Sequence, residues 1–246
     1  MRKVHIAIIA VFCLVNTVRG QANGKLIAEM KRLQETYSIG STLSFDVKYV
    51  YATESKPEIY LDSMMGSMEI NGNNYRIILN NTETIKNDRY IIHLFKDDKL
   101  IYLTKPNSGE TGNGPGALID SVFRNISSLS YTIDSNKIVK RIVLNFPTQS
   151  SFKTVVFTIN KATGYIIKAR YLVKTEQLLE TQNREKEAAD QYDEYAIVEA
   201  SYSNYKKDYR SPYSFDEKTV FVKSGNEYVP AEKFKDYSIF LGSPNL

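Results

Sequence analysis

Residues 43–51 read LSFDVKYVY, and apolar side chains alternate with polar ones along most of this stretch. One face of the segment carries Leu43, Phe45, Val47, Tyr49 and Tyr51. The other face carries Ser44, Asp46 and Lys48. A period of two residues predicts a β-strand with one face buried. Similar alternation continues to Thr104 between short turn clusters, which predicts an antiparallel meander.

Five more strands complete this predicted meander. They are Ser63–Ile70, Tyr75–Leu79, Thr82–Lys86, Arg89–Phe95 and Lys99–Thr104. Asn71, Gly72 and Asn73 mark a hairpin turn, because both residue types tolerate a positive φ angle. The last two strands are apolar on both faces, so we expect them to be covered on both sides. The first helix would be one cover, and the next helix, a ligand or a partner protein the other.

Two amphipathic segments predict helices that cover the sheet. Residues 24–38 place one apolar stripe on Leu26, Met30, Leu33 and Tyr37. A second helix is predicted to begin near Pro115, a residue type suited to the first helical position. Its broad apolar face carries Leu118, Ile119, Val122, Phe123 and Ile126.

Hairpins are predicted again after the second helix. The expected strands are Leu129–Asp134, Ile138–Phe146, Lys153–Ile159, Tyr165–Val173 and Glu194–Tyr205. Residues 176–193 are strongly charged, which predicts a solvated excursion. Residues 206–246 are expected to form a C-terminal extension with a polar loop and short strands at 220–222 and 237–241. The expected organisation is one domain over residues 21–246.

Residues 1–20 have the pattern of a secretory signal, with Arg2 and Lys3 ahead of an apolar run. Cleavage is expected near Gly20 and Gln21, so the rest of the chain is expected to be exported. The apolar run is too short for a membrane span, so we do not expect an integral membrane protein.

The composition argues against several classes of site. Of the net charge of +4, three positive charges belong to residues 1–20, so the remainder is close to balance and no nucleic-acid surface is indicated. The single cysteine, Cys13, lies inside the leader, and His93 is the one histidine that follows it. Metal sites and thiol chemistry built on Cys and His are therefore not expected.

Motifs that suggest catalysis or nucleotide binding have a simpler structural reading. Gly112, Gly114 and Ala117 match a relaxed dinucleotide fingerprint, but they follow hairpin strands instead of a parallel βαβ unit. His93 alternates with apolar neighbours in a strand, which favours a packing role over a general base. The carboxylate pair Asp97 and Asp98 occupies a predicted turn. We therefore expect no catalytic residue, no cofactor and no metal.

The order of these elements resembles the LolA family of periplasmic lipoprotein carriers over about residues 24–205. The stretches that carry the resemblance are LSFDVKY at 43–49, DSMMGSMEING at 62–72 and KLIYL at 99–103. The resemblance implies an α+β, mainly β fold. It would be a strongly curved antiparallel sheet, an open half-barrel, covered by two or three helices over an apolar cavity.

The resemblance also implies a non-catalytic binding protein for an acyl lipid or a lipoprotein. The expected cavity residues are Leu26, Met30, Leu33, Phe45, Tyr49, Tyr90, Ile92, Leu94, Leu118, Val122 and Phe123. Arg32 and Arg124 are candidates for a lid arginine by their location on the two helices. Three alternatives stay open: helices that fill the space and leave a solid core, a module that binds an envelope protein, and a hydrolase.

Overall fold

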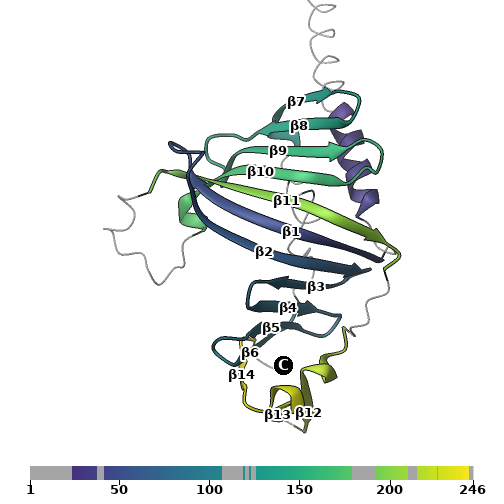
Figure 1. The fold of residues 1–246 in the computed structure, drawn as a ribbon, viewed down its shortest axis with the longest axis vertical. Coiled ribbons are helices and arrows are strands. Elements are labelled where there is room, and N and C mark those ends of the chain that lie inside the picture. The colour runs from purple at the N-terminus through teal and green to yellow at the C-terminus, as the bar shows by residue number, and fades with distance from the viewer. Residues whose placement is uncertain are drawn as a thin grey trace, which may run out of the picture.

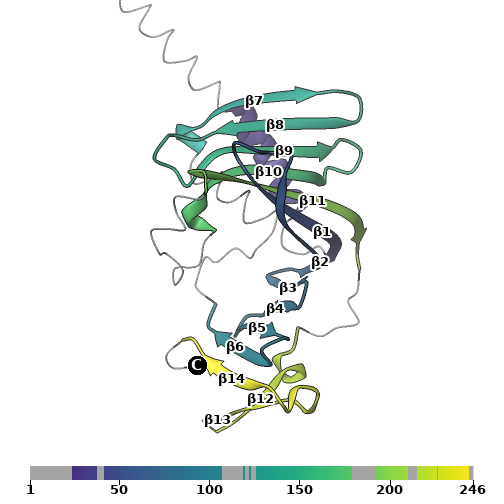
Figure 2. The ribbon, with the colours of Figure 1, turned by 60° about the vertical axis from the view of Figure 1, so that its left-hand side comes forward.

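The structure is a computed structural model that describes residues 24–37, 42–106, 119, 122, 126–178, 192–209, 215–225, 227–243 and 246. Its main feature is one sheet of twelve strands (Figure 1). The strand order is β14-β6-β5-β4-β3-β2-β1-β11-β10-β9-β8-β7. The sheet curves without closing on itself, so β14 and β7 form its two ends (Figures 1 and 2). The predicted curved, mainly β fold is confirmed.

The first half of the sheet is the predicted meander. Its strands are β1 (Thr42–Thr53), β2 (Tyr60–Asn71), β3 (Asn74–Leu79), β4 (Thr82–Lys86), β5 (Ile91–Phe95) and β6 (Leu100–Thr104). Each pairs with the next in antiparallel register. Gly72 and Asn80 turn the chain with φ angles of +61° and +48°, as glycine and asparagine do at little cost.

The second half returns to the first through one long strand. Its elements are η1 (Ile126–Ser128), β7 (Ser130–Ser135), β8 (Val139–Asn145), β9 (Phe152–Asn160), β10 (Ile166–Lys174), η2 (Thr175–Gln177) and β11 (Tyr195–Lys207). Strand β11 pairs antiparallel with both β10 and β1, so it joins the two halves. The ends of the charged excursion lie together, since the Thr175 amide donates to the Glu194 carbonyl at 2.9 Å.

The C-terminal residues form a small lobe at the β14 end of the sheet. It contains η4 (Glu217–Thr219), β12 (Phe221–Ser224), β13 (Glu227–Pro230), η5 (Glu232–Phe234) and β14 (Ser238–Leu241). Strands β12 and β13 form a separate hairpin, whereas β14 pairs with β6 in parallel. The predicted antiparallel pairing holds from β1 to β11, and β14 adds a parallel pair at this edge, because the chain reaches β6 again by a long connection.

The prediction of two or three covering helices is also wrong in part. Within the described ranges, one continuous α-helix covers the sheet, over residues 24–36, and lies against the strands near β7 to β10 (Figures 1 and 2). Ile119 and Val122 of the second predicted helix are helical and almost fully buried. None of the described helices combines the length and apolar character that a membrane crossing requires.

The sheet has two hydrophobic cores that lie on opposite faces. We call the face against the helix the inner face; its core joins Leu26 and Met30 of the helix to Phe45 and Met68 of the sheet. The second core contains Ile92 and Leu94 together with the C-terminal lobe. Successive residues of a strand point to opposite faces of the sheet. The register places His93, which lies between Ile92 and Leu94 in β5, on the same face as Met68. Ile92 and Leu94 therefore point to the other face. The C-terminal lobe therefore covers the outer face.

Candidate ligand-binding face

A row of paired residues crosses the inner face from the helix to the open edge of the sheet. The row runs Phe45, Met68, Ile77, Thr84, His93, Tyr102 and Phe240, one residue from each of β1 to β6 and β14. We call these residues the inner-face row. Phe45 is 2% exposed and Met68 6%. His93 and Tyr102 are half-buried, and Phe240 is 58% exposed, so the row becomes accessible toward the edge.

Aromatic rings form the accessible end of this row. The ring centroids of His93 and Tyr102 are 6.0 Å apart, and those of Tyr102 and Phe240 are 5.6 Å apart with an angle of 11° between the planes. The His93 Nδ1 atom lies 3.0 Å from the Thr84 hydroxyl oxygen. Gly242 packs over Tyr102 so closely that an added Cβ would lie 2.1 Å from the Tyr102 hydroxyl. The edge therefore presents an aromatic surface with polar atoms at its margin, in which the His93 ring is tilted by 40° from that of Tyr102.

Tyrosines line the inner face beneath the helix. The Ile166 amide donates to the Tyr37 hydroxyl at 2.9 Å, and the Tyr205 hydroxyl donates to the Ile166 carbonyl at 2.6 Å. The two hydroxyls lie 3.0 Å apart, which links the end of the helix to β10 and β11. Burial raises the pKa of Tyr37 and of Tyr205 above their ordinary value, and it does the same for Tyr171. The Tyr37 and Tyr205 hydroxyls act as neutral hydrogen-bonding groups.

The free energy of unfolding is expected to fall as the pH rises above about 10. Unfolded tyrosines ionise near pH 10, whereas the buried ones in the folded protein keep their protons, so the unfolded state binds fewer protons. Each such tyrosine contributes a slope of about 1.4 kcal/mol per pH unit. Urea unfolding at several alkaline pH values checks this. Tyr171→Phe should reduce the slope and exposed Tyr60→Phe should not; equal slopes in both variants would contradict the assignment.

The structure separates the predicted cavity residues into two groups. Those that lie together on the inner face are Leu26, Met30, Leu33, Phe45, Tyr49 and Val122. Ile92 and Leu94 lie instead on the outer face, and Tyr90 contacts Phe221 there with 5.2 Å between ring centroids. The prediction placed these three residues on the same apolar face as Phe45. They instead point to the opposite face, where the C-terminal lobe buries them. Leu118, Phe123 and Arg124 lie outside the described residues.

Arg32 lies on the solvent side of the helix. Its side chain is 70% exposed, and its Nη1 atom is 3.3 Å from an oxygen of Glu29. The other Glu29 oxygen pairs with Lys140 of β8 at 2.6 Å. The arginine is thus part of a surface ion-pair group that ties the helix to the sheet. Its proposed lid role remains a prediction.

His93, Tyr102 and Phe240 were not predicted as site residues. Alternation does separate His93 from Ile92 and Leu94, but it does not say which face the helix covers. Phe240 joins the row through the parallel pairing of β14 with β6, about 140 residues apart along the chain. No local pattern signals a pairing at such a distance.

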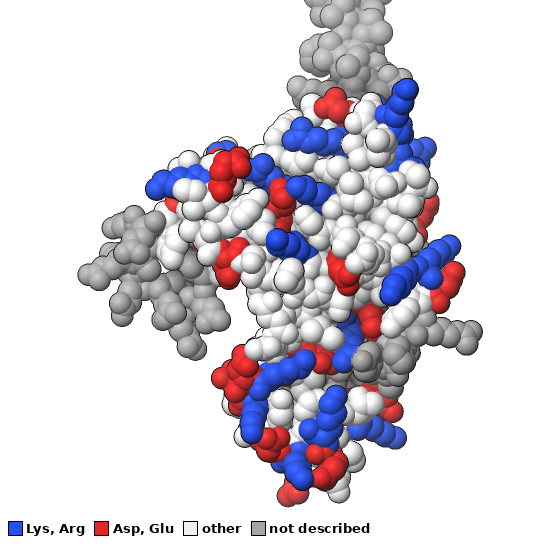
Figure 3. All heavy atoms as spheres, in the orientation of Figure 1, with Lys and Arg blue, Asp and Glu red and all other residues white. Residues whose placement is uncertain are grey.

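The described residues contain no group of three or more His, Cys, Asp or Glu side chains placed to hold a metal ion. Basic and acidic side chains alternate over the face of the molecule in view in Figure 3. The absence of a nucleic-acid partner remains a prediction.

A scan against models of known protein families and a search of curated proteins give no match. Among solved structures, an uncharacterized conserved protein from Thermus thermophilus aligns with a TM-score of 0.44 at 8% identity, over 76% of this chain and 90% of that one. A LolA superfamily protein from Nitrosomonas europaea aligns with a TM-score of 0.33 at 10% identity, over 73% and 91%. The MucA/MucB complex of Pseudomonas aeruginosa gives 0.39 at 9% identity, over 75% and 57%. Identities of 8% to 10% make all three of these likenesses remote.

Proposed function

We propose that the protein is a non-catalytic binding protein of the periplasm, and that the inner-face row receives the acyl chain of a lipid or lipoprotein. The observation that carries the proposal is the continuity of the row from the buried core to the open edge. The leader-like residues 1–20 support the periplasmic location.

The dimensions and chemistry of the row suit an acyl chain. Phe45 and Phe240 are six strand spacings of about 4.8 Å apart, which gives the row a length of about 29 Å. The hydrocarbon core of a bilayer, which contains two layers of acyl chains, is about 30 Å thick. The row is therefore longer than one acyl chain. Each buried methylene would contribute about 0.8 kcal/mol. We place the chain on His93, Tyr102 and Phe240, the accessible end.

A second function, the binding of an envelope protein, is favoured by one specific observation. Ile59, Tyr60 and Leu61 at the start of β2 are 59%, 60% and 57% exposed, which puts three apolar side chains in succession at the surface. Large apolar side chains exposed on both faces of a strand end are typical of interaction surfaces.

Protein purified from the periplasm without detergent is expected to carry a lipid. Organic extraction and mass spectrometry should find a near-stoichiometric lipid that an unrelated periplasmic protein lacks. Phe240→Ser should weaken lipid binding about fivefold and so lower the lipid content, since it removes about 1 kcal/mol of apolar contact. Val222→Ser is the matched control, because Val222 is 49% exposed and lies on β12 away from the row.

A clean extract, repeated after incubation with phospholipid vesicles, would contradict lipid binding. The exposed side chains of Ile59, Tyr60 and Leu61 would then make protein binding the favoured function.

A further inference from the structure

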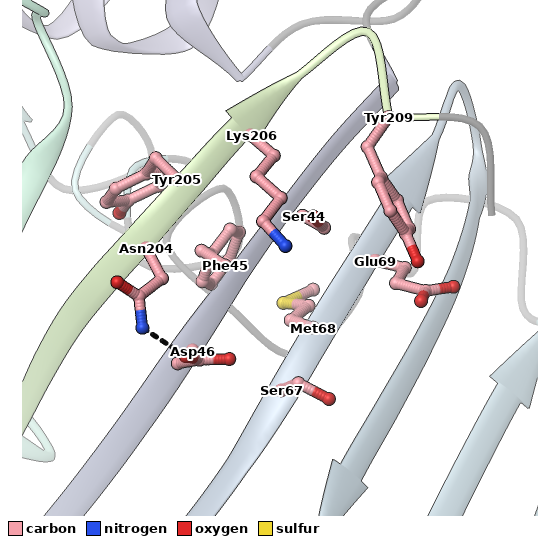
Figure 4. A pocket seen from close by; sticks show the side chains of 10 residues that line it. All are labelled: Ser44, Phe45, Asp46, Ser67, Met68, Glu69, Asn204, Tyr205, Lys206 and Tyr209. Carbon is pink, nitrogen blue, oxygen red and sulfur yellow. Dashed lines mark hydrogen bonds between the residues drawn. The ribbon is translucent and has the colours of Figure 1, made fainter.

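The outer face carries a polar pocket, whose lining also includes Phe45 and Met68 of the inner-face row. It has a volume of about 600 Å³, within the range of about 300 to 1,000 Å³ that is usual for small-molecule sites. Its lining residues come from β1, β2 and the end of β11 (Figure 4). Those that carry polar groups or a ring into it are Ser44, Asp46, Ser67, Glu69, Asn204, Lys206 and Tyr209.

A β-bulge builds one wall of this pocket. The register between β1 and β11 shifts so that Asn204 and Tyr205 lie opposite the single residue Phe45. Asn204 has a φ angle of +54°, which asparagine tolerates better than most residues. Tyr205 can therefore pack on Phe45, with 5.0 Å between ring centroids, while the Asn204 amide donates to Asp46 at 2.6 Å. Bulges of this kind commonly aim side chains into binding sites.

Cross-strand pairing spaces the polar groups on the scale of a sugar ring. Ser44 lies opposite both Glu69 and Lys206, and Asp46 lies opposite Ser67. Neighbouring strands are about 4.8 Å apart and alternate residues on one strand about 6.8 Å apart. The hydrogen-bond donors and acceptors are therefore spread in two dimensions over the pocket and are not concentrated at one charged group.

Tyr209 adds an aromatic surface to this array. Its ring is half-buried at the rim of the pocket, with the Lys206 amine 5.7 Å from the ring centroid (Figure 4). An aromatic ring beside carboxylate, amide and hydroxyl groups matches the two properties of a pyranose, an apolar C–H face and an equatorial belt of hydroxyls. Two carboxylates against one amine disfavour an anionic sugar.

We propose that this pocket binds a neutral saccharide, with one ring stacked on Tyr209 and its hydroxyls hydrogen-bonded to Asp46, Asn204 and Glu69. The proposal uses other side chains than the acyl-lipid function, because Asp46 and Glu69 point to the opposite face of the sheet from the inner-face row.

Isothermal titration calorimetry of the protein without residues 1–20 tests the proposal with three probes: cellotetraose, maltotetraose and chitotetraose. At least one should bind with a dissociation constant of about 1 mM or tighter. Tyr209→Ala should weaken binding about tenfold, whereas Tyr209→Phe, which keeps the ring, should stay within about twofold. Asp46→Ala should also weaken binding, because it removes an acceptor.

Two matched variants control for general effects. Lys48→Ala changes the next outward-facing residue of β1, outside the pocket, and Tyr60→Ala removes an exposed tyrosine elsewhere. Both should bind as the unmodified protein does. The proposal is overturned if no probe binds, or if a probe binds and Tyr209→Ala and Asp46→Ala leave its affinity unchanged. Thermal unfolding of each variant separates loss of the site from loss of the fold.

Discussion

Replacing Glu83 by alanine is expected to lower the free energy of unfolding by about 3 to 5 kcal/mol. Glu83 and Arg76 are 6% and 9% exposed on the outer face. The Arg76 Nη2 and Nε atoms lie 2.7 and 2.9 Å from one Glu83 oxygen, and Lys96 lies 3.5 Å from the other. Removal of the carboxylate leaves the guanidinium buried without its main counter-charge. Urea unfolding measures the loss.

Two further variants show what the Glu83 result means. Glu232→Ala breaks an exposed ion pair with Lys235 and should have little effect, because water solvates both charges. The double variant with methionine at positions 76 and 83 should recover most of the stability, since apolar side chains of similar volume replace a buried pair well. A loss below about 1 kcal/mol for Glu83→Ala would show that the guanidinium is solvated.

Replacing Phe221 by alanine is expected to cost about 3 to 5 kcal/mol. Phe221 is 1% exposed in the outer core, with its ring centroid 5.2 Å from that of Tyr90 and 5.5 Å from that of Tyr228. The cavity that remains would weaken the attachment of the C-terminal lobe to β4–β6. Hydrogen exchange should therefore accelerate in β12 to β14 more than in β8 to β10.

Val222→Ala is the control for Phe221→Ala, since the neighbouring side chain is 49% exposed. It should change the stability by less than about 1 kcal/mol. Equal losses in the two variants would contradict the position of Phe221 in a core.

The meander was predictable because alternation and turn residues are local signals. The period of two in β1 and the Asn71-Gly72-Asn73 turn are both present in the structure. The prediction that β5 and β6 are covered on both sides also holds for the outer face, where Ile92 and Leu94 are fully buried. Their cover was not predictable, because Phe221 and Phe234, which help to provide it, lie far along the chain from β5 and β6 and no local pattern signals such a contact.

The candidate site was predicted only in part. Spacing alone assigned Leu26, Met30 and Leu33 to one helix stripe, and these residues do pack with Phe45. To choose His93 instead of Ile92 and Leu94, one has to know which face of the sheet the helix covers. That depends on the strand register across β2 to β5, which is set by long-range pairing.

A photoactivatable fatty acid tests the inner-face site most directly. After irradiation of the protein without residues 1–20, peptide mass spectrometry should place the cross-links on His93, Tyr102 or Phe240. Excess unlabelled fatty acid should suppress them. Cross-links confined to the outer face, at Val222 or Val229, or none that unlabelled fatty acid suppresses, would contradict the binding of an acyl chain on the inner-face row.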